Sequence, residues 1–119
     1  MQKLSFVLAL VIGLFTATSA FAHSKLVNSK PADGSMLMEG VPAIELQFSA
    51  PVRLMKVELR GSAAGDIAID FKPAAESAQK YSVKIPALAV DSYEVHWVAM
   101  GPDGHKMSGN FGFMQHGSN

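Results

Sequence analysis

The sequence contains no cysteine among its 119 residues. This absence excludes disulfide frameworks, thiolate zinc sites, iron–sulfur clusters and cysteine nucleophiles. An excess of charge is also missing, because ten Lys and Arg residues balance ten Asp and Glu residues. A nucleic-acid-binding protein would carry clustered basic residues, so we expect no nucleic-acid partner. The groups left for chemistry are His, Asp, Glu, Met and the chain terminus.

A long apolar run is confined to the first segment. Lys3 precedes an almost entirely apolar stretch over 4–15, and small residues then lead to Ala20-Phe21-Ala22, a signal-peptidase pattern. The apolar stretch is shorter than the ~20 residues that span a bilayer, although an uncleaved membrane anchor remains the alternative. We predict a signal peptide over 1–22 and one exported domain over 23–119. Removing 22 residues from 119 leaves 97, with a formal charge of −1.

Short alternating segments separated by Pro, Asp and Gly predict an all-β fold. Tyr93, Val95, Trp97 and Ala99 fall on one face of an expected strand, and Trp97 is the expected core aromatic. Strands are expected near 25–27, 44–48, 54–59, 67–71, 81–85, 93–100 and 111–113. Seven strands in about 97 residues indicate a Greek-key β-sandwich of the cupredoxin or immunoglobulin type.

His23 becomes the first residue if cleavage follows Ala22. Its α-amine and Nδ1 atom then close a six-membered chelate ring on one metal ion. The ordinary pKa of an α-amine is about 7.7–8.0, so a metal ion can displace its proton near neutral pH. Cleavage after Ala20 is a rival arrangement, because it places His23 third in the chain, and a third-position histidine also chelates Cu(II).

Asp103-Gly104-His105 supplies a carboxylate and an imidazole in a turn between the last two expected strands. One carboxylate and three nitrogens in a plane suit Cu(II). Zinc is disfavoured, because structural zinc sites usually contain cysteine. The hypothesis requires the fold to bring His23 beside this turn.

Three sequence elements carry a resemblance to a known family: S-K-P-A-D-G-S at 29–35, F-S-A-P-V at 48–52 and D-G-H-K-M-S-G at 103–109. With His23 and Y-E-V-H-W at 93–97, they resemble the CopC family of periplasmic copper-binding proteins over essentially the whole mature chain. The resemblance implies a cupredoxin-like sandwich and a Cu(II) site made of the α-amine and imidazole of His23 with Asp103 and His105. It further implies a periplasmic protein in copper homeostasis or resistance, acting as a carrier or buffer, with a CopD-type membrane protein as partner. The sequence leaves the oligomeric state open, and we expect a monomer.

Two features depart from the family pattern. Ala50 stands where many members have Glu in F-S-E-P-V, so any tuning of the copper site by that carboxylate is missing or supplied elsewhere. The mature chain has six methionines but no methionine-rich loop. Core packing explains most of them, and a Cu(I) cluster remains an alternative, formed by His116 with methionines drawn from Met36, Met38, Met107 and Met114.

Two other function classes stay open. A terminal-histidine chelate resembles the histidine brace of copper-dependent polysaccharide monooxygenases, but Asp103 would fill an equatorial position and no aromatic platform is evident. We therefore expect no catalysis. The third class is a metal-free interaction module. His96 is expected to be exposed or hydrogen-bonded rather than a ligand, and His116 is expected to lie in a frayed polar tail.

Overall fold

The computed structural model describes residues 24–117, so the predicted signal peptide and His23 lie outside the described residues. Strand β6 (Asp91–Met100) shows how the alternating pattern builds the core. Its alternate residues Tyr93, Val95, Trp97 and Ala99 are each at most 5% exposed, whereas Glu94 is exposed. Successive side chains of a strand point to opposite faces, so β6 presents one apolar face to the interior. The expected core position of Trp97 is confirmed.

The described residues form seven strands and no helix, which confirms the expected all-β fold. The strands are β1 (Leu26–Lys30), β2 (Ser35–Leu37), β3 (Ala43–Gly61), β4 (Gly65–Ile67), β5 (Ala78–Lys84), β6 and β7 (Lys106–Gln115). Their order across the hydrogen-bonded sheet is β1-β3-β6-β7-β2, with β4 and β5 paired to β3. All pairs are antiparallel except β2 with β7.

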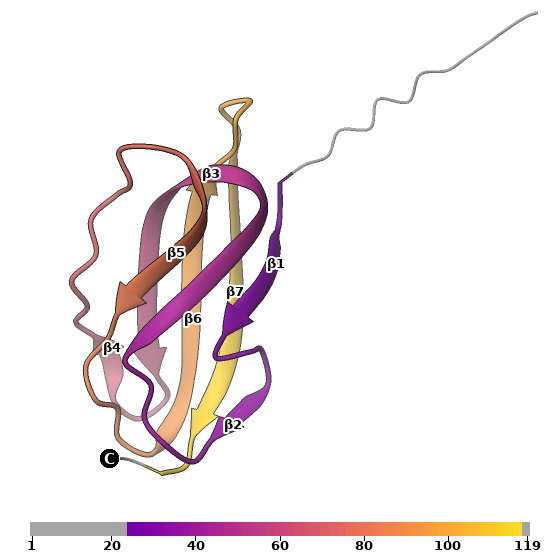
Figure 1. The fold of residues 1–119 in the computed structure, drawn as a ribbon. Helices are drawn as coiled ribbons and strands as arrows, with labels where there is room; N and C mark the ends of the chain where they lie inside the picture. Colours follow the sequence, from indigo (N-terminus) through magenta and orange to yellow (C-terminus); the bar gives the residue numbers. More distant parts are fainter. Residues whose placement is uncertain (1–23, 118–119) are drawn as a thin grey trace, which may run out of the picture.

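The long strand β3 belongs to both layers of the sandwich (Figure 1). Its first half pairs with β1 and β5, and its second half pairs with β4 and β6. At the crossing, the register with β5 shifts between Gln47 and Val52. The Tyr81 hydroxyl donates to the carbonyl of Val52 at 2.6 Å and accepts from the amide of Leu54 at 3.4 Å. This side chain therefore satisfies backbone groups where the ladder is interrupted.

The expected strand boundaries differ from the observed ones in three places. Segments 44–48 and 54–59 are parts of one strand, because Pro51 falls at the crossing, where a donor to the ladder is not required. The strand expected over 67–71 is wrong: β4 ends at Ile67, and the apolar side chains of Ile69 and Phe71 pack on the core from an irregular segment. The short strand β2 lies outside the seven expected segments.

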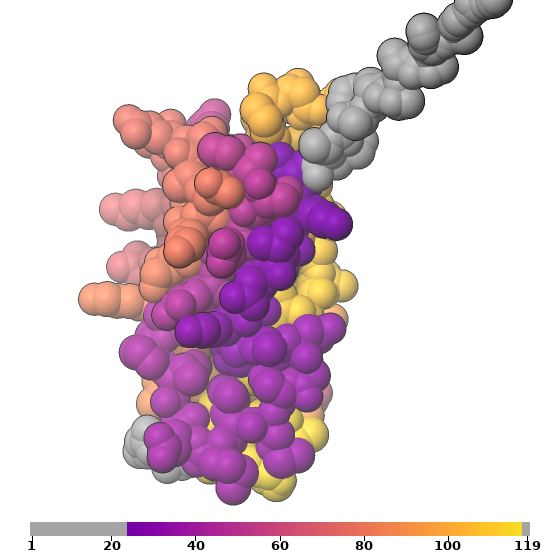
Figure 2. Space-filling model, turned by 45° about the vertical axis from the view of Figure 1, so that its right-hand side comes forward, coloured from indigo at the N-terminus to yellow at the C-terminus, as the bar shows by residue number. Residues whose placement is uncertain are grey.

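The core lies between the two layers and is closed by aromatic contacts. Phe48 makes edge-to-face contacts with Trp97 at 5.2 Å and with Tyr81 at 6.4 Å between ring centroids. The start of β1 and the β6–β7 turn lie at one end of the sandwich, as Figures 1 and 2 both show. Strand β2 and the β3–β4 turn lie at the other end. Residues 24–117 contain no helix with the length and apolar character needed to cross a bilayer.

Candidate metal centre

The β6–β7 turn is closed by its own backbone hydrogen bonds. The amide of Gly101 donates to the carbonyl of His105 at 2.9 Å, and the amide of Gly104 donates to the carbonyl of Gly101 at 3.0 Å. Gly104 has a φ of 83°, in the left-handed region that favours glycine. The sequence Asp-Gly-His thus forms part of a tight turn, with Gly104 in the conformation that the turn requires.

The turn brings the Asp103 carboxylate and the His105 imidazole together, as the sequence predicts. Oδ1 of Asp103 accepts the backbone N–H of His105 at 3.1 Å, and Oδ2 lies 3.0 Å from Nδ1 of the ring. The backbone hydrogen bond from His105, followed by the contact with its ring, lowers the pKa of Asp103. When Nδ1 carries the proton and donates to the carboxylate, Nε2 is left free to bind a metal ion.

Both side chains of the pair are accessible. The His105 side chain is 83% exposed and that of Asp103 is 54% exposed. Gly101 lies behind them and is buried; a Cβ atom there would be 3.2 Å from Oδ1 of Asp103 and 3.2 Å from Cε of Met107. The missing side chain at position 101 therefore gives the carboxylate and the methionine room to approach the backbone.

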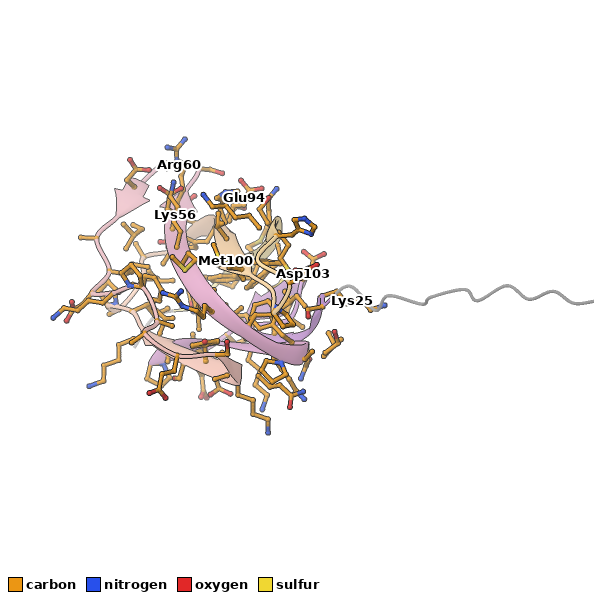
Figure 3. The ribbon with its side chains drawn as sticks, turned by 90° about the horizontal axis from the view of Figure 1, so that it is seen from above. Lys25, Lys56, Arg60, Glu94, Met100 and Asp103 are labelled. Atoms are coloured by element: carbon orange, nitrogen blue, oxygen red, sulfur yellow. The ribbon has the colours of Figure 1, made fainter. Side chains whose placement is uncertain are left out.

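The start of β1 is fixed at the same end of the molecule. The amide of Lys25 donates to the Ser49 hydroxyl at 2.9 Å, and the amide of Ser49 donates to the carbonyl of Lys25 at 2.8 Å. Figure 3, a view from above, places the labelled Lys25 and Asp103 on the same side of the sandwich, in agreement with Figure 1. Sequence reasoning missed Ser49, although the F-S-A-P-V element contains it.

Residues 24–117 contain no group of three His, Asp or Glu side chains placed to hold a metal ion. Of the predicted set, the described residues bring Asp103 and His105 together, and His23 lies outside them. The pair alone offers two side-chain ligands. A four-ligand site at this turn therefore requires donors from another segment, and the chain that leads into β1 is the neighbouring one.

The other histidines of the described residues lie elsewhere. Nδ1 of His96 is 2.9 Å from Oδ1 of Asn110, which confirms the expectation of a hydrogen-bonded histidine. The side chain of His116 is exposed, as expected, but its backbone amide donates to Leu37 at 2.7 Å. The expected fraying of this tail is therefore wrong for His116, because the backbone after β7 is bound to β2.

The methionines of the alternative Cu(I) cluster divide between the two ends. Met36 and Met114 are register partners on β2 and β7, and Met38 follows β2; all three are exposed. Met107 is half-buried at the other end of β7 and packs on the core. The alternative thus keeps Met36, Met38 and Met114 with His116 as neighbours in the fold and loses Met107.

The comparisons with known proteins concern the family and the fold of the chain. At 32% identity, the chain is similar to copper resistance protein C of Pseudomonas syringae pv. tomato, covering 95% of this chain and 96% of the relative. Its fold is similar to that of CopC from Methylosinus trichosporium OB3b, with a TM-score of 0.67 and 22% identity over 80% of this chain and 95% of that one.

A second solved structure with the same fold is PcoC, a methionine-rich copper resistance protein from Escherichia coli. It aligns with a TM-score of 0.64 and 24% identity over 79% of this chain and 99% of that one. These two likenesses confirm the expected β-sandwich. The family model described as the CopC domain matches residues 26–116. The chain therefore belongs to the CopC family.

Proposed function

We propose that the processed chain binds one Cu(II) ion in the periplasm and acts in copper homeostasis or resistance as a carrier or buffer. The ligands are the α-amine and imidazole of His23, the carboxylate of Asp103 and the imidazole of His105. The observation that carries the proposal is the exposed Asp103–His105 pair at the end of the sandwich where β1 begins. Family membership supports copper as the cargo.

The covalent chain supports the approach of His23 to this turn. Two extended residues span at most about 7 Å, so the Cα atom of His23 stays within about 7 Å of the Cα atom of Lys25. Lys25 is itself fixed by two hydrogen bonds to Ser49. Signal-peptide cleavage after Ala22 would free the α-amine, so the precursor lacks a donor that the processed protein has.

Each protein group has a distinct task in the proposed site. The α-amine and Nδ1 of His23 form the chelate, and the α-amine loses a proton when the metal binds. The low pKa of Asp103 keeps its carboxylate ionised at neutral pH, which supplies negative charge beside the cation. The exposure of His105 leaves the bound ion accessible, which suits transfer to a CopD-type membrane partner.

The first test is the intact mass and copper stoichiometry of protein purified from the periplasm. We expect a chain that starts at His23 and binds one Cu(II). Adding one alanine before His23 removes the terminal chelate and should weaken binding more than about 100-fold, beyond the loss typical of supporting groups. A mass that starts at Phe21 would replace this site with the rival chelate, and unchanged affinity of the extended protein would overturn the proposal.

Histidine variants give a matched control. His105→Ala should alter the electron paramagnetic resonance (EPR) spectrum of the bound Cu(II), because it removes one of the proposed ligands. His96→Ala removes a histidine that is bound to Asn110 and should leave the spectrum unchanged. Equal effects of the two substitutions would contradict the assignment of copper to the β6–β7 turn.

A further inference from the structure

The contact between Lys25 and Ser49 lies where an ordinary ladder hydrogen bond is expected. Leu26 of β1 is paired with Phe48 of β3, so the next antiparallel pair outward is Lys25 with Ser49. In a hydrogen-bonded antiparallel pair, the two residues exchange both N–H···O=C bonds. One of these is present, because the amide of Ser49 donates to the carbonyl of Lys25 at 2.8 Å.

The second bond of this pair is made by a side chain. The amide of Lys25 donates to the hydroxyl of Ser49 at 2.9 Å and not to its carbonyl. The reason lies in β3, which leaves the layer of β1 at this point and shifts its register beyond Gln47 on the way to the other layer. The Ser49 hydroxyl therefore accepts the Lys25 amide in place of the Ser49 carbonyl.

We propose that Ser49 is the positioning residue of the copper site. Its hydroxyl and amide hold the peptide of Lys25, and so hold the terminal nitrogen donors near the Asp103–His105 pair. This inference rests on the proposed function and names a residue that acts through the backbone without touching the metal. Ala50 adds no polar side-chain group beside it, so the serine is the side chain that ties the start of β1 to β3.

The surroundings support a positioning role over a general stabilising one. The Ser49 side chain is exposed and takes no part in the core. Its partner lies outside the strand ladder and two residues from the proposed ligand. The buried residues that flank it, Phe48 and Val52, hold β3 in place independently of the hydroxyl.

The experiment compares two variants of equal shape in the periplasmic, processed protein. Ser49→Thr keeps the hydroxyl and Ser49→Val removes it, and both residues favour strands. We expect native Cu(II) affinity and EPR parameters for the threonine variant. The valine variant should bind Cu(II) about 10–100-fold more weakly, the loss typical of groups that orient metal ligands. Equal affinities and spectra for the two variants would overturn the inference.

Two controls separate the inference from the proposed function. If the native protein binds no Cu(II), the proposed function fails, whereas native binding with no difference between the two variants refutes the role of Ser49 alone. In the protein extended by one alanine before His23, where the terminal amine is no longer a ligand, Ser49→Val should cause no further loss. An undiminished further loss there would assign Ser49 a merely structural role.

Hydrogen exchange tests the same point with Ser49 left in place. In the copper-free processed chain, the amide hydrogen of Lys25 should be protected from exchange with solvent, because it is bound to the Ser49 hydroxyl. The Ser29→Ala variant, which removes a different β1 hydroxyl that donates to Pro31, should keep this protection. Exchange of the Lys25 amide at the rate of an unfolded peptide would overturn the inference.

Discussion

Two aspartates at opposite ends of the sandwich accept backbone hydrogen bonds, but they differ in how many they accept and in which segments donate them. Asp91 receives the amides of Ala63 and Ala64 on Oδ2, both at 2.9 Å, and the amide of Ser92 on Oδ1 at 2.8 Å. Asp103 receives one amide, that of His105, and otherwise contacts an exposed imidazole. Hydrogen bonds lower the pKa of both carboxyls.

The difference lies in what the hydrogen bonds hold. The three amides at Asp91 come from the β3–β4 turn and the start of β6, so this carboxylate joins two segments of the fold. The contacts of Asp103 stay within one turn, and its partner ring is open to solvent. A low pKa is therefore shared by a structural and a chemically available carboxylate, and the identity of the partners distinguishes them.

Exchanging each aspartate for asparagine gives the largest expected contrast. Asp103→Asn removes the negative charge beside His105 and should weaken Cu(II) binding about 10–100-fold, with little change in Tm. Asp91→Asn should lower Tm, because an amide has one oxygen where the carboxylate uses two, and should leave Cu(II) affinity unchanged. Copper titration and thermal unfolding of both variants check this, and a shared pattern would remove the distinction.

A glycine stands behind each aspartate, and the two glycines should respond unequally. A Cβ atom at Gly61 would lie 2.6 Å from Oδ2 of Asp91 and 2.9 Å from the Tyr93 ring, whereas at Gly101 the nearest atoms are at 3.2 Å. Gly61→Ala should therefore destabilise the fold by about 1–3 kcal/mol through overpacking. Gly101→Ala should cost less stability and weaken Cu(II) binding several-fold. Urea unfolding curves that rank the two variants in the reverse order would contradict this comparison.

Lowering the pH should destabilise the fold through protonation of Asp91. We expect this effect to be smaller than those of the aspartate and glycine substitutions. Its folded-state pKa lies below the ordinary value of 3.8, so its ionised form stabilises the fold at any pH above 3.8. This contribution is lost as the pH falls from 3.8 through the folded-state pKa. Thermal unfolding of the copper-free protein should lose Tm over that range, and Asp91→Asn should lose less. An equal loss of Tm in the two proteins over this pH range would argue against a contribution from the hydrogen bonds of Asp91.

The alternating apolar pattern was enough to predict the fold class but not the strand pairing. Alternation correctly identifies the buried face of β6. It also marks Ile67, Ile69 and Phe71 as inward-facing, and these residues do pack on the core, but no partner strand continues beyond Ile67. Burial depends on the apolar character of the residue itself, whereas a strand also requires a partner strand. The sequence pattern carries information about burial but not about pairing.

The same limit applies to the candidate metal centre. The proximity of Asp103 and His105 is predictable because a glycine turn brings close neighbours together, and their side chains are in contact in the structure. Ser49 and Lys25 are 24 residues apart, and their contact arises because β1 lies beside β3 at the point where β3 changes layer. No local pattern encodes that crossing, so this pair became visible only in the fold.

The closure of the β6–β7 turn by its own backbone has an evolutionary consequence. The backbone groups of Gly101, Gly104 and His105 form hydrogen bonds with one another. These hydrogen bonds close the turn without a partner from the core. Residues 103 and 105 can thus be exchanged for other donors while the scaffold stays as it is. Two substitutions in this turn could therefore change the metal preference of the domain without altering its fold.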